Sequence, residues 1–393
     1  MLKKKIVVNS LFSPVKTGRE QSMNRAIPNH FYTTREQFLE ERERIFAPMW
    51  TCIGFASDVP NAGDVYPVEF MELPLVMVRD LDHRLRVFHN VCRHRGHILV
   101  NEPGTVKQNI RCPYHAWTYN LSGCLLRTPH IGGFGINEVE SFDRSEFGLN
   151  EIATAEWNDL IFVNLTGTAS SFDAFISPLV DRWEPLWGKT GPDLLRLPKQ
   201  HSRIHLDLNA NWKLAVENYL EAYHLPSVHP ALNRVSPLQD HDLHLSDTFA
   251  GQISHCYNLG SGNDGHFPVF PEWSTDKFKE AEYPVLFPNT MLGIQPDHLF
   301  VMVVIPESFD RTREETRLYY VGDESLAPQF DNLRQEQHQF WSEVFAEDIS
   351  VVTSMQAGRA STGFDGGVLT PVMETATARF HQWVGERVGI QIG

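Results

Sequence analysis

Two short cysteine–histidine clips constrain this chain more than any other feature. The first reads Cys92-Arg-His94 and the second Cys112-Pro-Tyr-His115, with residues 95–111 between them. Two thiolates and two imidazoles in such short clips can converge on one metal centre. A structural zinc site is the alternative, but zinc knuckles usually carry Cys-x2-Cys, and the single residue between Cys92 and His94 is unusual for them.

The mixed ligand set favours an iron–sulfur cluster of the Rieske type. In a Rieske [2Fe–2S] cluster, two histidines replace two cysteines on one iron and raise the reduction potential. Cys92 and Cys112 are therefore expected to hold one iron, and His94 and His115 the other. Such a centre handles single electrons.

A second group of potential ligands lies in residues 211–230. Apolar residues recur there at helical spacing, which predicts one helix with Glu217, Glu221 and His224 on a common stripe. Pro226 should then bend or end the helix and bring His229 to the same side as His224. Two histidines and one carboxylate form the facial triad of non-haem Fe(II) oxygenases.

The carboxylate of this triad can come from a later part of the chain. Residues 329–357 form a second strong helix pattern, which contains Glu347 and Asp348. From the pattern alone, either acid can complete the triad.

Together these motifs resemble the catalytic α subunit of Rieske non-haem iron oxygenases, the ring-hydroxylating type. The resemblance covers about residues 30–385 and rests on three motifs: Cys-x-His…Cys-x2-His, Asn-Trp-Lys…Glu-Asn-Tyr…Tyr-His-x4-His, and Glu-Asp…Gln. It implies that His224, His229 and Asp348 bind the mononuclear iron, with Asp348 preferred over Glu347.

The resemblance also implies a role for the acid three residues before the first iron-binding histidine. In this family an acid at that position bridges the two metal centres. Many members carry Asp there, whereas this chain carries Glu221, as do members that act on quaternary ammonium compounds. Asn218 and Tyr223 are further candidates for groups near the iron.

The distribution of strand and helix patterns predicts an α+β fold of two domains. Residues 1–45 are expected to be a tail and a lead-in helix that packs on the catalytic domain. Short β-rich runs in residues 46–165 predict a small antiparallel sandwich for the cluster. Residues 166–393 are expected to form a larger catalytic domain, an antiparallel sheet with helices of the helix-grip kind.

Helices are expected near 172–187, 212–224 and 330–355, and strands at 203–208, 298–305 and 317–321. The stretch 236–271 has little periodicity and reads as a long loop over the active site.

Composition limits the classes of partner. The formal net charge of −15 argues against nucleic acid or an anionic membrane. No run of about 18 apolar residues exists to span a membrane, and the start of the chain does not read as a secretory signal. Few cysteines beyond the clips point to a reducing compartment, so we expect a cytoplasmic protein.

The resemblance implies a terminal oxygenase with a Rieske cluster, mononuclear Fe(II) and O2 as co-substrate. A flavin or iron–sulfur NAD(P)H reductase, with or without a ferredoxin, would supply electrons. The chain would form a homotrimer in which the cluster of one subunit serves the iron of its neighbour. Monooxygenation or dihydroxylation, and the need for a β subunit, stay open.

The expected substrate is a small molecule that is hydroxylated or N-demethylated. Glu221 favours a quaternary ammonium compound, which aromatic side chains can hold through cation–π contacts; the candidates are Tyr257, Phe267, Phe270 and Trp273. An aromatic acid is the alternative within the same class. A pure electron-transfer Rieske protein is the alternative from another class, but it would need neither the second motif nor so long a C-terminal region.

Overall fold

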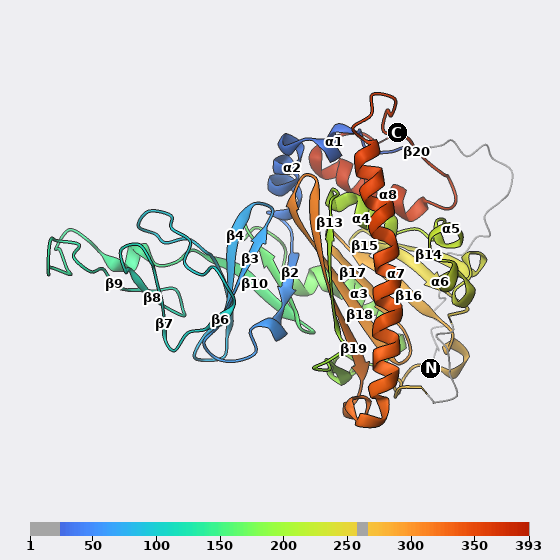
Figure 1. Cartoon of the computed structure of the whole chain (residues 1–393), viewed down its shortest axis with the longest axis horizontal. Helices are drawn as coiled ribbons and strands as arrows, with labels where there is room; N and C mark the ends of the chain where they lie inside the picture. Colours follow the sequence, from blue (N-terminus) through green and yellow to red (C-terminus); the bar gives the residue numbers. More distant parts are fainter. Residues whose placement is uncertain (1–23, 258–265, 393) are drawn as a thin grey trace, which may run out of the picture.

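The computed structural model describes residues 24–257 and 266–392. The chain forms an elongated molecule, with a narrow end built from the strands of residues 51–164 and a wider body from residue 195 onward (Figure 1). The body combines one large antiparallel sheet with helices, so the predicted α+β class is confirmed. Within the described residues, no helix is long and apolar enough to cross a membrane.

The narrow end contains two antiparallel sheets. The larger has seven strands in the order β2-β11-β10-β5-β4-β3-β6. They are β2 Thr51–Phe55, β3 Asp64–Phe70, β4 Leu73–Arg79, β5 Leu85–His89, β6 Gly104–Thr105, β10 Glu151–Trp157 and β11 Leu160–Asn164. The smaller has three, β7 Asn109–Arg111, β8 Thr118–Asn120 and β9 Leu125–Arg127. Because β2 and β11 pair at one edge, the chain enters and leaves the larger sheet at the same side.

The body is built on an eight-stranded antiparallel sheet. Its main path runs β12-β19-β18-β17-β16-β15-β14, and β13 also pairs with β19. The strands are β12 Leu195–Arg196, β13 Arg203–Leu208, β14 His241–Leu245, β15 Phe249–Ser254, β16 Ala281–Leu286, β17 Thr290–Ile294, β18 His298–Ser308 and β19 Arg311–Val321. The central strands β17 and β18 are almost wholly buried, because helices cover the sheet.

Two helices position the candidate iron site. Helix α4 (Trp212–Tyr219) packs on β18, and the long helix α7 (Asp331–Gly358) crosses the sheet and contacts α4 and β13 (Figure 1). Two others complete the body, α3 (Phe172–Trp187) and α8 (Thr375–Val388). The predicted helices at 172–187 and 330–355 and the predicted strands at 203–208, 298–305 and 317–321 are confirmed.

Two local predictions were wrong in part. The lead-in helix expected within residues 1–45 is a short helix α2 (Arg35–Glu41) followed by a π-helical turn (Arg42–Phe46), so it is not one regular helix. The stretch 236–271 is not one loop, because the paired strands β14 and β15 lie in it; residues 258–265 lie outside the described residues. Both strands were missed because polar residues occupy the edge strand β14.

The segment before the narrow end packs on the catalytic body through a buried ion pair. Lys213 of α4 is fully buried, and its Nζ donates to Glu41 Oε1 at 2.5 Å and to the carbonyl of Phe31 at 2.8 Å. Glu41 also accepts from the indole N–H of Trp212 at 2.8 Å. A buried lysine is tolerated only with such partners. The N-terminal segment therefore holds the start of α4, the helix that leads to the candidate iron ligands.

Candidate metal centres and cavity

The two cysteine–histidine clips fold into copies of one turn. In the first, the N–H of Cys92 donates to the carbonyl of His97 at 2.8 Å, and that of Gly96 to the carbonyl of Cys92 at 2.9 Å. In the second, Cys112 donates to Trp117 at 2.8 Å and Ala116 to Cys112 at 3.1 Å. Gly96 and Ala116, each four residues after its cysteine, have φ of +72° and +59°. Glycine reaches this left-handed region readily, whereas Ala116 is held there by its turn.

The ligand side chains are arranged in two layers. Both cysteines are buried at 3% exposure, whereas both histidines are exposed and their ring centroids lie 4.8 Å apart. Burial, then His115 and Arg95, lowers the pKa of His94, which favours the neutral imidazole that binds a metal. A buried thiol pair under an exposed imidazole pair fits a cluster whose inner iron takes sulfur and whose outer iron takes nitrogen.

Two aromatic residues support the first clip. The indole of Trp117 stacks on His94 with ring centroids 4.7 Å apart. The hydroxyl of Tyr119 lies 3.3 Å from Cys92 Sγ and accepts the backbone N–H of Arg93 at 3.0 Å. Burial raises the pKa of Tyr119, so its proton stays available to a cysteine sulfur. Hydrogen bonds to cluster sulfurs tune the reduction potential. Sequence reasoning missed Tyr119, because only its position seven residues after Cys112 points to the cluster.

The candidate iron site lies where a helix is interrupted. Helix α4 ends at Tyr219, and the next helical turns are α5 (Leu225–Val228) and α6 (Pro230–Val235). The prediction of one helix through His224 was therefore wrong, since the break comes before Pro226. Glu221 and His224 both lie in the irregular stretch between α4 and α5, and this stretch turns them toward α7.

The predicted common stripe of Glu217, Glu221 and His224 was also wrong. Glu217 points the other way and is buried, where its Oε1 accepts from the hydroxyl of Tyr32 at 2.6 Å and lies 3.0 Å from His381 Nε2. Burial opposes the charge of Glu217, but His381, Arg359 and Tyr32 outweigh it and lower its pKa. Glu217 therefore anchors α4 and does not reach the candidate iron site.

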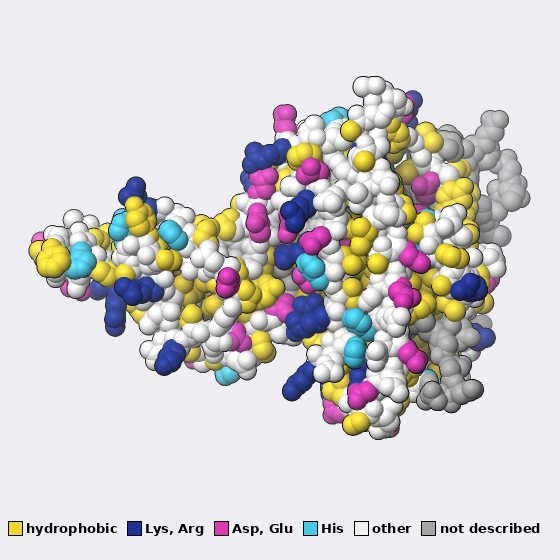
Figure 2. Space-filling view, viewed as in Figure 1, with side chains coloured by type: hydrophobic (Ala, Val, Ile, Leu, Met, Phe, Trp, Pro, Cys, Tyr) yellow, Lys and Arg dark blue, Asp and Glu magenta, His cyan; other side chains and the backbone are white. Residues whose placement is uncertain are grey.

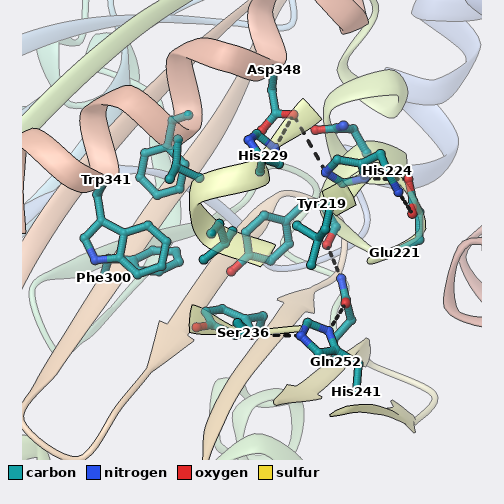
Figure 3. A pocket seen from close by; sticks show the side chains of 16 residues that line it. Tyr219, Glu221, His224, His229, Ser236, His241, Gln252, Phe300, Trp341 and Asp348 are labelled. Carbon is teal, nitrogen blue, oxygen red and sulfur yellow. Dashed lines mark hydrogen bonds and ion pairs between the residues drawn. The ribbon is translucent and has the colours of Figure 1, made fainter. Parts of the chain in front are cut away.

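Three side chains converge as a candidate metal site: His224, His229 and Asp348. One ligand atom of each lies within 4.8 Å of the others. Asp348 Oδ1 lies 2.9 Å from His229 Nε2 and 3.8 Å from His224 Nε2, and the two rings are 5.1 Å apart at 72° (Figure 3). The structure thus brings together the residues that the resemblance implies, and their role as iron ligands stays a prediction.

Two further carboxylates fix which nitrogen each histidine presents. Glu221 Oε1 lies 2.7 Å from His224 Nδ1, and Glu347 Oε2 lies 2.6 Å from His229 Nδ1. Both Nδ1 atoms are thereby occupied as donors, so each Nε2, which faces Asp348, is the nitrogen that can present a lone pair to a metal. This geometry distinguishes Glu347 from Asp348, which the sequence pattern did not. Glu347 contacts the far side of a ligand, and Asp348 faces the metal position.

The electrostatics of His229 agree with this reading. The ring is 1% exposed, and burial alone would lower its pKa. The carboxylates of Asp348 and Glu347 outweigh burial, so the net pKa of His229 is raised. Two carboxylates around one buried imidazole favour a positive charge between them, and a divalent cation supplies it. Two nitrogens and one oxygen, with open positions toward a cavity, fit Fe(II).

A cavity of about 520 Å³, including its open mouth, extends from this candidate metal site. Its wall carries five aromatic side chains, Tyr219, Tyr283, Phe300, Trp341 and Phe345. A second part of the wall carries three polar residues, Ser236, His241 and Gln252 (Figure 3). Asn218 lines the cavity, as predicted for a group near the iron site.

Other predicted site residues do not line the cavity. Tyr223 is 54% exposed and points away from it. The proposed cage residues Tyr257, Phe267, Phe270 and Trp273 are buried in the core, so that expectation was wrong. The aromatic wall comes instead from the end of α4, from strands β16 and β18 and from α7, which are far apart in the sequence.

The two centres lie far apart within one chain. The clips flank β7 at the tip of the narrow end, whereas α5 and α6 lie on the far side of the body (Figure 1). The tip also exposes apolar side chains, with Phe134 at 99%, Ile136 at 53% and Tyr114 at 53% exposure.

Basic side chains surround the same tip. Among them Arg93 and Arg95 are exposed beside His94. In the space-filling view, dark blue side chains lie on the narrow end and also over the body, with acidic ones among them (Figure 2). The clips therefore lie beside exposed arginines and exposed apolar side chains.

A buried-thiol clip pair beside the small three-stranded sheet and a two-histidine, one-carboxylate site among the helices of the body fit an oxygenase with two iron centres. The comparisons with known proteins agree. Residues 49–143 match the Rieske [2Fe-2S] domain, and residues 195–390 match the Ring hydroxylating alpha subunit (catalytic domain) family. The chain belongs to the Rieske non-haem iron oxygenases, as an α subunit, and its cofactors are a Rieske cluster and a mononuclear iron.

Its relatives include oxygenases named for quaternary ammonium substrates. The chain is 30% identical over 354 residues to the carnitine monooxygenase oxygenase subunit of Escherichia coli K12, covering 86% of each chain. It is 25% identical over 409 residues to the glycine betaine monooxygenase oxygenase subunit of Pseudomonas aeruginosa, covering 95% of this chain and 92% of that one. The crystal structure of the quaternary ammonium Rieske monooxygenase CntA with γ-butyrobetaine superposes with a TM-score of 0.72 at 26% identity, covering 94% and 97%.

Proposed function

We propose that this chain is a terminal oxygenase that hydroxylates or N-demethylates a small quaternary ammonium compound. The observation that carries the proposal is the cavity, which joins the candidate iron site to an aromatic wall and contains no Lys or Arg among its described lining residues. A cavity with carboxylates, aromatic faces and no basic side chain suits a cation.

The residues of the chain have distinct parts in this activity. We assign the iron to His224, His229 and Asp348, and the cluster to the four clip residues. When bound, these groups supply one-electron storage and O2 reduction. Glu221 and Glu347 hold the two histidines in one tautomer.

The aromatic wall is rigid enough to orient a ligand. The indole N–H of Trp341 lies 3.4 Å from His298 Nε2, and its ring lies 4.5 Å from that of Phe300. The wall can therefore hold an ammonium group over its faces and keep water from the site.

Electrons have to reach the chain from outside, and we propose a flavin or iron–sulfur NAD(P)H reductase as their source. We also propose a homotrimer in which His94 or His115 of one subunit lies against Glu221 of the next. The long separation of clips and cavity within one chain supports this arrangement. The exposed apolar side chains of the tip and the arginines beside His94 support it too, because such groups suit burial against a neighbouring subunit. We further propose that residues 46–165 form the cluster domain and that residues 166–393 form the catalytic domain.

An aromatic acid is a weaker candidate. Its carboxylate needs a cationic or strongly donating partner when it leaves water, and the described cavity lining offers no Lys or Arg.

Single turnover tests the proposed function without knowledge of the reductase. The iron-loaded enzyme is reduced without oxygen, mixed with pooled quaternary amines and aromatic acids, and exposed to isotopically labelled O2. We expect a labelled hydroxylated amine, or a demethylated amine with matching formaldehyde. The Asp348→Asn variant is the control and should give no product. A labelled aromatic product in place of an amine product would overturn the substrate proposal.

A further inference from the structure

The cavity has a polar corner whose function the proposed reaction does not explain. Ser236 follows α6, His241 begins β14, and Gln252 lies on β15. In Figure 3 these three residues lie on the opposite side of the cavity from His224, His229 and Asp348. They are therefore placed to meet the end of a ligand whose other end is at the candidate iron site.

The hydrogen bonds of this corner run in one direction. Gln252 Nε2 donates to the carbonyl of Tyr219 at 3.1 Å, which turns Gln252 Oε1 toward His241 Nδ1 at 2.9 Å. An amide oxygen only accepts, so His241 Nδ1 carries a proton. His241 Nε2 then accepts from the hydroxyl of Ser236 at 2.8 Å, and Ser236 accepts from Ser254 at 2.6 Å.

The corner is uncharged. Burial lowers the pKa of His241, and neighbouring His255 lowers it further, while Gln252, Ser236 and Asp240 act in the opposite direction. The net effect is a lowered pKa, which keeps the ring neutral at neutral pH. The charged residues among the described cavity lining, histidines aside, are Glu221 and Asp348, both acidic.

The directed chain of bonds determines which ligand groups fit. Each hydroxyl and ring hydrogen is already used within the corner, which leaves lone pairs on Ser236 and Gln252 and one N–H of the Gln252 amide. A hydroxyl can donate to one of these lone pairs and accept the N–H. A carboxylate only accepts, so its lone pairs would face those of Ser236 and Gln252, with no cation to compensate for lost hydration.

We infer that Ser236, His241 and Gln252 form the subsite for the polar end of the substrate, and that this subsite selects a hydroxyl or similar neutral group over a carboxylate. The inference rests on the proposed function and narrows its substrate class. The preferred compound is a trimethylammonium cation with a hydrogen-bonding, uncharged tail.

Matched ligand pairs test the inference by binding alone. Titration calorimetry on the oxidised, iron-loaded enzyme compares choline with glycine betaine, and 4-hydroxybutyl-trimethylammonium with γ-butyrobetaine. Each pair keeps the trimethylammonium group and the chain length, and replaces a terminal CH2OH group by a carboxylate. The two chain lengths allow for either distance between the aromatic wall and the polar corner. We expect the hydroxyl compound to bind at least about tenfold more tightly in the pair that fits, because an uncompensated carboxylate is costly to bury.

Two variants separate the subsite from general effects. Ser236→Ala removes one acceptor, so the affinity for the hydroxyl compound should fall about five- to tenfold while that for the carboxylate compound stays within about twofold. Ser227→Ala is the control, because Ser227 is exposed on α5 and does not line the described cavity, and it should keep the wild-type preference.

The outcomes distinguish this inference from the proposed function. If carboxylate compounds bind as tightly as their hydroxyl partners, or more tightly, the subsite assignment is overturned and the quaternary-ammonium proposal stands. If no trimethylammonium compound binds, both are overturned. A preference for hydroxyl compounds that survives Ser236→Ala would also remove Ser236 from the subsite.

Discussion

Glu314 is expected to lower the stability of the iron-free enzyme at neutral and alkaline pH. It lies on β19 and is 7% exposed, in a space of about 300 Å³ that it shares with Asp348. Most other residues around this space are apolar, and no described residue forms a hydrogen bond or ion pair with the Glu314 carboxylate. Burial, and secondarily the charge of Asp348, raises the pKa of Glu314 to about 8.

The size of the effect follows from this pKa. The ordinary value is 4.5, so folding shifts it by about 3.5 units, and each unit corresponds to about 1.4 kcal/mol. The bound proton stabilises the fold fully below about pH 4.5, and this stability is lost as pH rises through about 8. The wild type should therefore lose about 3 kcal/mol by pH 7 and about 5 kcal/mol above pH 8.

Glu314→Gln removes the titration while keeping shape and volume. Its free energy of unfolding relative to wild type should rise with pH, by about 1 kcal/mol at pH 5.5 and about 5 kcal/mol at pH 8.5. This difference in unfolding free energy is measured by urea unfolding after the mononuclear iron has been removed with a chelator. The transition to follow is that of the catalytic body. Glu336→Gln is the control, since Glu336 is exposed on α7 and should show no pH-dependent gain.

Iron loading provides an internal check. A divalent cation beside Asp348 favours the charged form of Glu314, so the advantage of Glu314→Gln should shrink when iron is restored. An advantage that does not change between pH 5.5 and 8.5 would refute the reasoning, because Glu314 would then be solvated or ionised in the folded chain.

Three further predictions concern the metal centres. Asp348→Asn should abolish iron binding at the mononuclear site, whereas Glu347→Gln should weaken it about 10- to 100-fold, as iron titration of the chelated enzyme would measure; equal losses would mean that both acids bind the metal. Mixed trimers of Cys92→Ala and His224→Ala subunits should recover part of the activity that each variant lacks, and no recovery in verified mixtures would exclude transfer between subunits. Glu221→Gln should weaken iron binding to a similar degree, because Glu221 holds His224 as Glu347 holds His229, and with both metals loaded at saturating iron turnover should still fall at least about tenfold; wild-type turnover would remove Glu221 from the catalytic site.

The parts of the site that lie in short local motifs were predictable from sequence. Cys92 and His94 have to share one turn because a single residue separates them, and the same holds for Cys112 and His115. Asp348 could be proposed as a ligand from the sequence because α7 is a long helix with a regular apolar face. Glu347 and Asp348 were not separable by pattern, since neighbouring helix residues differ only in the direction that the packed helix gives them.

The helix break before His224 was not predictable from periodicity. Apolar residues continue at helical spacing through the break, and Pro226 suggested a later end. Glu217 is held by Tyr32 and His381, which come from opposite ends of the chain, and α4 ends two residues later at Tyr219. Contacts between residues so distant in sequence leave no local signal.

The contrast between local motifs and contacts of distant residues also applies to function. The sequence predicts the reaction better than it predicts the substrate. The ligands set the chemistry, and they lie in motifs that a reader of the sequence can find. The cavity wall depends on strand register, because Tyr283 on β16, Phe300 on β18 and Trp341 on α7 meet only when the sheet and α7 pack. His241 and Gln252 lie in a stretch that reads as a loop. We therefore expect substrate choice to depend on residues that meet only in the folded chain, and the hydroxyl-against-carboxylate comparison tests that expectation directly.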